Sequence, residues 1–233
     1  MADSWKSRKS AWRDTWRHDL DAPGNGWRAT WDMMLHDHGL LRRINPNFAT
    51  VAPGIWRMSQ PGPRELRRLA RRGLRTVVNL RGANEIGSYA LERRAADALG
   101  LTLIDCPLRS NRPPTVAEVL ALDEVFRTAE RPLLVHCKSG ADRAGLASAL
   151  YLLLNDAPVA QARAQLSLRF LHFSTGKTGI LDHFIDAYAT AQTDSGIAFR
   201  DWLTGVYDPA ALAASFTPTR LGDLLVSRLL ARE

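Results

Sequence analysis

The chain has 233 residues, 45% of them hydrophobic, and 31 Lys and Arg against 24 Asp and Glu give it a net charge of +7. The apolar content argues against disorder as the main state, and the length suits one or two domains of roughly 100–200 residues. Two cysteines cannot form the framework of a small disulfide-rich secreted protein. No segment approaches the roughly 18 consecutive apolar residues of a transmembrane helix, and the basic N-terminus lacks the apolar stretch of a signal peptide. The sequence therefore predicts a cytoplasmic protein with two free thiols.

Residues 1–45 are rich in tryptophan and arginine. Five of the seven tryptophans fall within the first 31 positions, and Trp5, Trp12 and Trp16 are spaced by seven and four residues. This spacing places the three rings on one face of a helix. Two interpretations are open. The segment either packs on the main domain as an extension, or lies in a membrane interface and gives the protein a peripheral membrane contact.

Beyond residue 48, strand-like and helix-like segments alternate. Short runs of β-branched or apolar residues predict strands at 55–58, 76–80, 101–106 and 132–136. Apolar residues at helical spacing predict helices at 63–72, 85–99, 115–129 and 144–154, with further helices in 157–231. Thr115 and Glu118 form a capping box at the start of the third helix. The alternation is typical of an α/β fold with a central, mainly parallel sheet flanked by helices.

Most of the basic excess is arginine, and one cluster of it lies on and after the helix predicted at 63–72. Its members are Arg64, Arg67, Arg68, Arg71, Arg72, Arg75 and Arg81. Such a cluster either forms an ordinary solvated face or attracts a partner rich in phosphate. Nucleic acid is not the expected partner, because no zinc finger or ribonucleoprotein motif accompanies the cluster.

One short segment carries the chemistry. Cys137 comes directly after the apolar run at 132–136, at the end of the buried strand. Arg143 follows Cys137 after five residues, at the start of the next helix. The loop between them is Lys138, Ser139, Gly140, Ala141 and Asp142. Backbone N–H groups of a tight loop that enters a helix N-terminus converge on one point and bind a tetrahedral anion. The arginine can close over that anion with two parallel hydrogen bonds, and the same field favours the thiolate form of the cysteine.

His136, Cys137 and Arg143 in this spacing resemble the CX5R signature of the cysteine-dependent protein tyrosine phosphatase superfamily. The surrounding segments 54–61, 77–81 and 145–154 resemble those of bacterial dual-specificity and atypical tyrosine phosphatases. The resemblance covers about residues 45–190. It predicts an N-terminal extension at 1–45, a phosphatase domain at 46–192 with a dual-specificity-phosphatase-like fold, and a C-terminal helical extension at 193–233 packed on the same domain.

The resemblance also implies roles for the loop residues. Cys137 would attack phosphorus and form a cysteinyl-phosphate, which makes the protein a hydrolase of phosphomonoesters. Arg143 would bind the phosphoryl oxygens together with residues 138–142, and His136 would order the loop. No cofactor is needed. No metal site is expected at His36, Asp37 and His38, because three adjacent residues cannot all face one ion.

The general acid is less clearly marked. The family usually has an aspartate about 30 residues before the cysteine, and Asp105 lies at 137 − 105 = 32 residues. Asp105, however, is predicted within a strand, and the following loop at 109–114 has no carboxylate. Asp142, inside the phosphate loop, is the alternative acid. A third alternative is a substrate whose leaving group needs no acid.

Two further positions depart from, or add to, the family pattern. Ala144 stands where many relatives have Ser or Thr, a hydroxyl that helps the thiolate leave when the intermediate is hydrolysed. Its absence implies slow breakdown of the cysteinyl-phosphate. A catalytically weak or inactive phosphate-binding module is therefore the alternative function. A sulfur-transfer enzyme is the lowest-ranked alternative. Cys106 is either an ordinary buried cysteine or a redox partner that traps an oxidised Cys137 as a disulfide.

The substrate class stays open between several anionic molecules. Lys138 adds positive charge at the rim of the loop, as in relatives that act on inositol phosphates and phosphoinositides. Phosphotyrosine or phosphoserine proteins, phosphoinositides and other phospholipids all fit this charge. The basic N-terminal segment favours an anionic or membrane-associated substrate, and hence a cytoplasmic protein that contacts the membrane peripherally.

Overall fold

The computed structural model describes residues 2–37 and 45–218, and the side chains of residues 2–6 and 36 are outside that description. Three predictions therefore lie outside the described residues. They are the position of the Trp5 ring, the absence of a metal site at His36 and His38, and helix beyond residue 218. The chain forms two compact units. The sheet unit comprises Met1–Asp105 and Glu130–Ser139, and the helical unit comprises Cys106–Ala129 and Gly140–Glu233.

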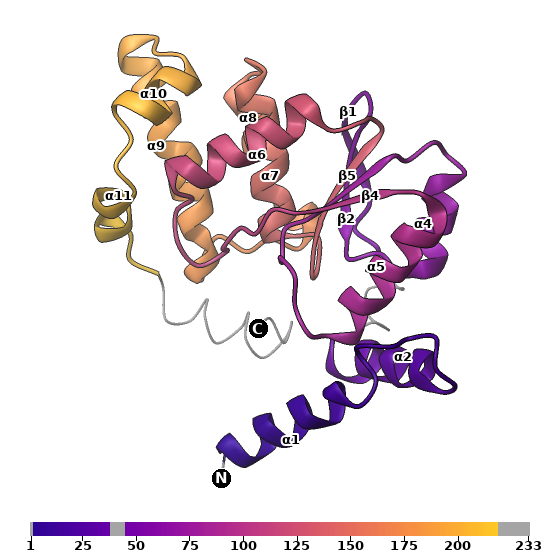
Figure 1. Cartoon of the computed structure of the whole chain (residues 1–233). Helices are drawn as coiled ribbons and strands as arrows, with labels where there is room; N and C mark the ends of the chain where they lie inside the picture. Colours follow the sequence, from indigo (N-terminus) through magenta and orange to yellow (C-terminus); the bar gives the residue numbers. More distant parts are fainter. Residues whose placement is uncertain (1, 38–44, 219–233) are drawn as a thin grey trace. The chain divides into compact units, whose positions relative to one another are not determined.

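The sheet unit is built on five strands (Figure 1). In spatial order they are β1 (Ala49–Ala52), β2 (Ile55–Ser59), β5 (Leu133–Cys137), β3 (Thr76–Asn79) and β4 (Thr102–Asp105). β1 is antiparallel to β2, and all other pairs are parallel. The predicted α/β fold with a mainly parallel sheet is confirmed. β1 was not predicted from the sequence, because four residues with two alanines carry little strand signal.

Helices α4 (Pro63–Ala70) and α5 (Gly87–Leu99) cover one face of this sheet. Leu66 and Leu69 of α4 and Ala96 of α5 pack with Val77 and Leu134 of the strands in one buried core. α4 begins at Pro63, as predicted, and ends at Ala70, because Gly73 adopts a left-handed conformation three residues later. The helix therefore ends two residues before the predicted end at residue 72.

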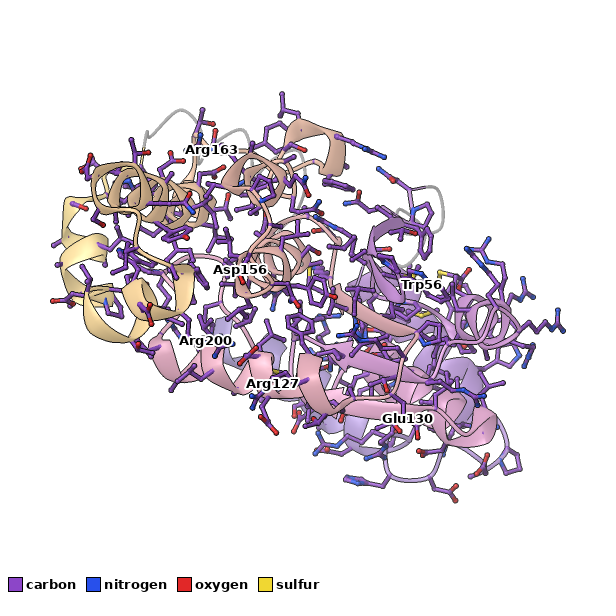
Figure 2. All side chains as sticks on the ribbon, turned by 90° about the horizontal axis from the view of Figure 1, so that it is seen from above. Trp56, Arg127, Glu130, Asp156, Arg163 and Arg200 are labelled. Atoms are coloured by element: carbon purple, nitrogen blue, oxygen red, sulfur yellow. The ribbon has the colours of Figure 1, made fainter. Side chains whose placement is uncertain are left out.

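An aromatic pair on the same face engages one arginine of the basic cluster. Trp56, labelled in Figure 2, has its ring centroid 6.1 Å from that of Phe48. The guanidinium carbon of Arg72 lies 5.3 Å from both ring centroids. This is the geometry of a cation–π contact, so Arg72 contributes to packing as well as to the surface charge.

The N-terminal helices α1 (Ala2–Asp14) and α2 (Asn25–His36) pack within the sheet unit. Trp16 is buried against Ala29 of α2 and Leu91 of α5, and its ring lies 5.4 Å from that of Trp12. Asp32 is fully buried; it accepts hydrogen bonds from the Arg13 guanidinium and, at 2.7 Å, from the backbone N–H at the start of α5. Contact of this segment with a membrane stays a prediction.

The helical unit contains the other helices of the described residues. These are α6 (Val116–Thr128), α7 (Asp142–Leu154), α8 (Val159–Arg163), α9 (Ile180–Ser195), α10 (Phe199–Gly205) and α11 (Pro209–Ser215), with 3₁₀ turns at Leu168–Phe170 and Lys177–Gly179. The predicted capping box of α6 is confirmed: the N–H of Thr115 donates to Glu118 at 2.8 Å, and the N–H of Glu118 donates to the Thr115 hydroxyl at 3.2 Å. None of the described helices combines the length and the apolar character needed to cross a membrane.

Within this unit, one buried carboxylate joins α6 to α10. Asp123 lies 2.9 Å from the guanidinium of Arg200 and 3.8 Å from that of Arg127. Both arginines are labelled in Figure 2. Beside this ion pair, α9 and α10 share a cluster of edge-to-face and tilted rings formed by Phe184, Tyr188, Phe199, Trp202 and Tyr207. The helical unit therefore combines a cluster of packed aromatic rings with an ion pair between α6 and α10.

The close approach of α2 to α5 gives a prediction about stability. A Cβ on Gly87 would lie 2.3 Å from the backbone oxygen of Ala29, so α2 must shift to admit it. We expect Gly87→Ala to lower the free energy of unfolding by about 1–3 kcal/mol in urea denaturation. Gly205→Ala is the matched control, because no atom lies within 4 Å of its added Cβ. A Gly87→Ala protein as stable as the parent would contradict the close packing of α2.

Candidate active site

The loop after β5 begins at the centre of the sheet. Cys137 is the last residue of β5 and only 2% exposed, and its register partner on β2 is Ser59. On the other side, Asn79 of β3 is the register partner of His136. Gly140 has a φ of +74°, a conformation that other residues rarely adopt, and α7 begins two residues later at Asp142. The predicted sequence of buried strand, tight turn and helix is therefore present.

The first half of the loop is tied to its own unit by two hydrogen bonds. The backbone N–H of Gln60 donates to the carbonyl of Lys138 at 3.3 Å. The side-chain amide of Asn47 donates to the carbonyl of Ser139 at 3.1 Å. Both donors come from segments that flank β1 and β2, so strand pairing also fixes the backbone that follows Cys137.

His136 is fully buried and faces a carboxylate. Its Nε2 lies 2.8 Å from Oε1 of Glu92 on α5, and Glu92 is fully buried as well. Oε2 of Glu92 accepts a hydrogen bond of 2.7 Å from the side-chain amide of Gln60. A carboxylate removed from water is costly without a donor. The Gln60 amide supplies a hydrogen bond to one oxygen of Glu92, and the His136 ring lies beside the other. Glu92 and Gln60 were not predicted to be site residues.

Asp142 belongs to a second buried cluster, in the helical unit. His172 is 2% exposed; its Nδ1 lies 2.8 Å from Oδ1 of Asp142, and its Nε2 lies 2.7 Å from Oδ2 of Asp182. Burial alone would lower the pKa of His172, but the two carboxylates outweigh it and raise the pKa to about 9. Near neutral pH the ring is therefore a cation that donates to both acids.

Asp105 lies at the end of β4, in the strand as predicted. The amide of Asn79 donates to its Oδ1 at 2.7 Å, and the hydroxyl of Tyr89 donates to its Oδ2 at 2.6 Å. Burial, followed by the hydrogen bond to Asp105, raises the pKa of Tyr89 to about 12, so the phenol remains a donor. Since β3 separates β4 from β5, Asp105 and Cys137 end strands roughly 10 Å apart at the same edge of the sheet.

The second thiol lies next in the chain. Cys106 is buried and free, and burial raises its pKa. A thiol of this kind is a poor nucleophile near neutral pH. Its role as a redox partner of Cys137 stays a prediction. In the loop that follows, Arg112 forms an ion pair with Glu118 at 2.6 Å and so extends the capping box of α6.

A cavity of about 380 Å³ lies in the sheet unit beside the end of β2. Its wall is mainly apolar and includes Met33, Met34, Met58, Leu91, Pro46 and Pro63. Arg64 and Arg68, both exposed, bring positive charge to it, and Gln60 connects it to the phosphate loop through its bond to Lys138. Part of the predicted basic cluster therefore lines a cavity next to the loop. Among the described residues, no three His, Cys, Asp or Glu side chains converge as metal ligands would.

The family is decided by comparison with known proteins. A family model described as "DSP-PTPase phosphatase fused to NAD+ Kinase" matches residues 46–178, which is more than half of the chain. The chain belongs to this phosphatase family. A comparison with curated proteins finds no match. The matched range contains β1–β5, α4–α7 and the whole segment from His136 to Arg143.

Solved structures of similar fold agree with the family. TpbA from P. aeruginosa is 19% identical with a TM-score of 0.52, and the match covers 74% of this chain and 91% of TpbA. The core catalytic domain of the PP-IP phosphatase SIW14 from S. cerevisiae, solved with citrate, is 18% identical with a TM-score of 0.50; the match covers 64% of this chain and 93% of SIW14. At these identities the likeness shows the fold, and it confirms the predicted dual-specificity-phosphatase-like architecture.

The pKa of His172 gives a prediction about the dependence of stability on pH. Because its pKa is about 9 in the folded protein against 6.5 for an ordinary histidine, its contribution is complete below pH 6.5 and is lost as the pH rises through 9. We expect urea denaturation to show a loss on the order of 3 kcal/mol over this window, and His172→Gln to remove it. His183→Gln, whose partner is the hydroxyl of Ser215, is the control. An unchanged pH profile in His172→Gln would contradict the paired geometry.

Proposed function

We propose that the phosphatase hydrolyses phosphomonoesters through a cysteinyl-phosphate on Cys137. The observation that carries the proposal is the strand–loop–helix segment inside the family match. A cysteine ends the central parallel strand, a left-handed glycine turns the chain, and Arg143 stands in the first turn of α7. A helix N-terminus and successive backbone N–H groups favour an anion at this place. Lys138 adds positive charge from the same loop.

The proposed reaction has two steps. In the first, the thiolate of Cys137 attacks phosphorus, the S–P bond forms, and the P–O bond to the leaving group breaks, with a proton passing to the leaving oxygen. In the second, water attacks the same phosphorus, the S–P bond breaks, and inorganic phosphate leaves as the thiolate is restored. Arg143 donates two N–H groups to the phosphoryl oxygens throughout, where negative charge accumulates in both transition states.

Of the two candidate acids, the geometry favours Asp105. Asp142 is buried, and its Oδ1 accepts a hydrogen bond from the protonated ring of His172. Asp105 is exposed and lies at the same edge of the sheet as Cys137. Asn79 and Tyr89 orient its carboxyl group. We therefore assign Asp105 as the general acid and Asp142 as a residue that positions the start of α7.

The acid assignment predicts a dependence on the leaving group. Asp105→Asn is expected to lower kcat by roughly 10²–10⁴ on an alkyl phosphate, whose leaving oxygen needs a proton, and far less on p-nitrophenyl phosphate. Asp142→Asn is the matched variant and is expected to affect both substrates alike. Steady-state kinetics on the two substrates measures this difference. Equal losses on both substrates in Asp105→Asn would refute the assignment.

The substrate is proposed to be strongly anionic. Lys138 at the loop and Arg64 and Arg68 at the neighbouring cavity supply positive charge, and the methionine-rich wall suits an apolar or aromatic group. TpbA has been solved in complex with pTyr, and SIW14 is a PP-IP phosphatase. Phosphoproteins and phosphorylated inositols, free or in a lipid, are therefore the classes to test. A cytoplasmic setting, where both thiols stay reduced, is part of this proposal.

A phosphate-binding module without turnover is the second candidate function. Ala144 favours it, because no hydroxyl follows Arg143 to help the thiolate leave. In that case phosphate binds, or a phosphoenzyme forms and persists. Release of more than one phosphate per chain excludes this candidate.

The nucleophile is tested by substitution. We expect p-nitrophenyl phosphate hydrolysis that vanadate inhibits, and Cys137→Ser should lower kcat to background, a loss of at least about 10³-fold. Cys106→Ser is the matched control and should retain most of the activity, since Cys106 takes no part in the proposed reaction. Full activity in Cys137→Ser would show that the mechanism is wrong.

A further inference from the structure

A chain of buried polar contacts runs from the N-terminal segment to the residue before the proposed nucleophile. Asp37, just after α2, accepts two hydrogen bonds from the Arg81 guanidinium, at 2.7 and 2.9 Å. The same guanidinium donates to the side-chain carbonyl of Gln60. The amide nitrogen of Gln60 donates to Glu92 at 2.7 Å, and the other oxygen of Glu92 lies 2.8 Å from Nε2 of His136.

The order of donors along this chain is fixed. Arg81 carries only donors, so the carbonyl oxygen of Gln60 must face it, and the NH₂ group of Gln60 must then face Glu92. A flipped amide would bring donor against donor at Arg81 and acceptor against acceptor at Glu92. The position of Glu92 is therefore set from the Arg81 side, and the carboxylate turns its free oxygen toward His136.

The polar side chains of this chain of contacts are buried, so the loss of any one contact would be destabilising. Asp37 is 1% exposed, Gln60 is 4% exposed, and Glu92 and His136 are fully buried. In such surroundings an ionised group without a partner is strongly destabilising, so each member of the chain of contacts requires the next. The chain contains two carboxylates and one guanidinium.

α5 supports both ends of the chain. Glu92 lies one helical turn after Ser88, whose hydroxyl donates to Asp37. The register neighbours of His136 are Met58 on β2 and Asn79 on β3, and neither titrates. Glu92 is therefore the charged group of α5 that lies beside the ring.

We propose that Glu92, held through Gln60 and Arg81 by Asp37 of the N-terminal segment, is a positioning residue that keeps the His136 ring in place beside Cys137. The N-terminal segment is then part of the phosphatase machinery and not only an extension. This proposal rests on the proposed function in taking Cys137 as the nucleophile. It assigns no contact with substrate to Glu92 or Asp37.

The test is the reactivity of the Cys137 thiol, which needs no turnover. The full chain is alkylated with iodoacetamide at a series of pH values, and peptide mass spectrometry follows Cys137 and Cys106 separately. We expect Glu92→Gln to raise the pH of half-maximal alkylation of Cys137 by about one pH unit, because a His136 ring that is no longer held leaves the loop N–H groups that stabilise the thiolate less ordered. Asp37→Asn should raise it by less. The profile of Cys106 should stay the same in all samples.

Two controls match the two variants. Asp97→Asn removes an exposed carboxylate from the same helix as Glu92. Asp21→Asn removes an exposed carboxylate of the N-terminal segment that also pairs with an arginine, Arg94. Neither should move the Cys137 profile. A loss of thermal stability in Glu92→Gln or Asp37→Asn with an unchanged profile would show a merely structural role and overturn the proposal.

The outcomes separate this proposal from the proposed function. If Glu92→Gln does not fold, Asp37→Asn decides, because Asp37 lies at the far end of the chain from His136. An unchanged Cys137 profile in a folded variant of an active enzyme overturns the positioning role alone. Full hydrolysis by Cys137→Ser overturns the proposed mechanism, whatever the alkylation profiles show.

Discussion

Burial of β5 between two parallel neighbours is the constraint on which the sheet unit depends. All five residues of β5 are buried, and His136 is the one whose side chain is strongly polar. A buried imidazole requires partners. Glu92 on the facing helix lies 2.8 Å from Nε2 of His136, and Gln60 in turn donates a hydrogen bond to Glu92. The strand that delivers the cysteine to the phosphate loop thereby determines which polar groups the surrounding helices must contribute.

The same logic gives the N-terminal segment its place. Asp32 and Asp37, at either end of one short stretch, are both buried, and each is held by an arginine and by a group at the start of α5. Packing of tryptophan explains why α1 and α2 stay on the unit, but it does not explain two buried carboxylates. The hydrogen-bond partners of the two carboxylates explain their burial. Of the hydrogen bonds of the Arg81 guanidinium described above, those to Asp37 would be lost without Asp37, and the one to the carbonyl of Gln60 would remain. The division of the chain at residues 45 and 192 stays a prediction.

Local features of the sequence were sufficient for much of the fold and for the centre of the site. The apolar run of β5, the capping box of Thr115 and Glu118, and the proline that begins α4 are each determined within a few residues. The spacing of Cys137, Gly140 and Arg143 predicted the turn for the same reason. Glu92, His172 and Asp182 could not be found, since their partners lie ten to forty-four residues away and no periodicity joins them. Glu92 alone left a trace, as a lone charge on the buried side of α5.

In the proposed mechanism, the phosphoryl group passes through Cys137. Rapid quenching of the enzyme with p-nitrophenyl phosphate, followed by peptide mass spectrometry, measures this directly. We predict that the peptide containing Cys137 gains the mass of one phosphoryl group at early times, and that the species accumulates because Ala144 leaves its breakdown slow. Turnover of substrate with no phosphoryl group on Cys137 at any quench time would contradict this mechanism.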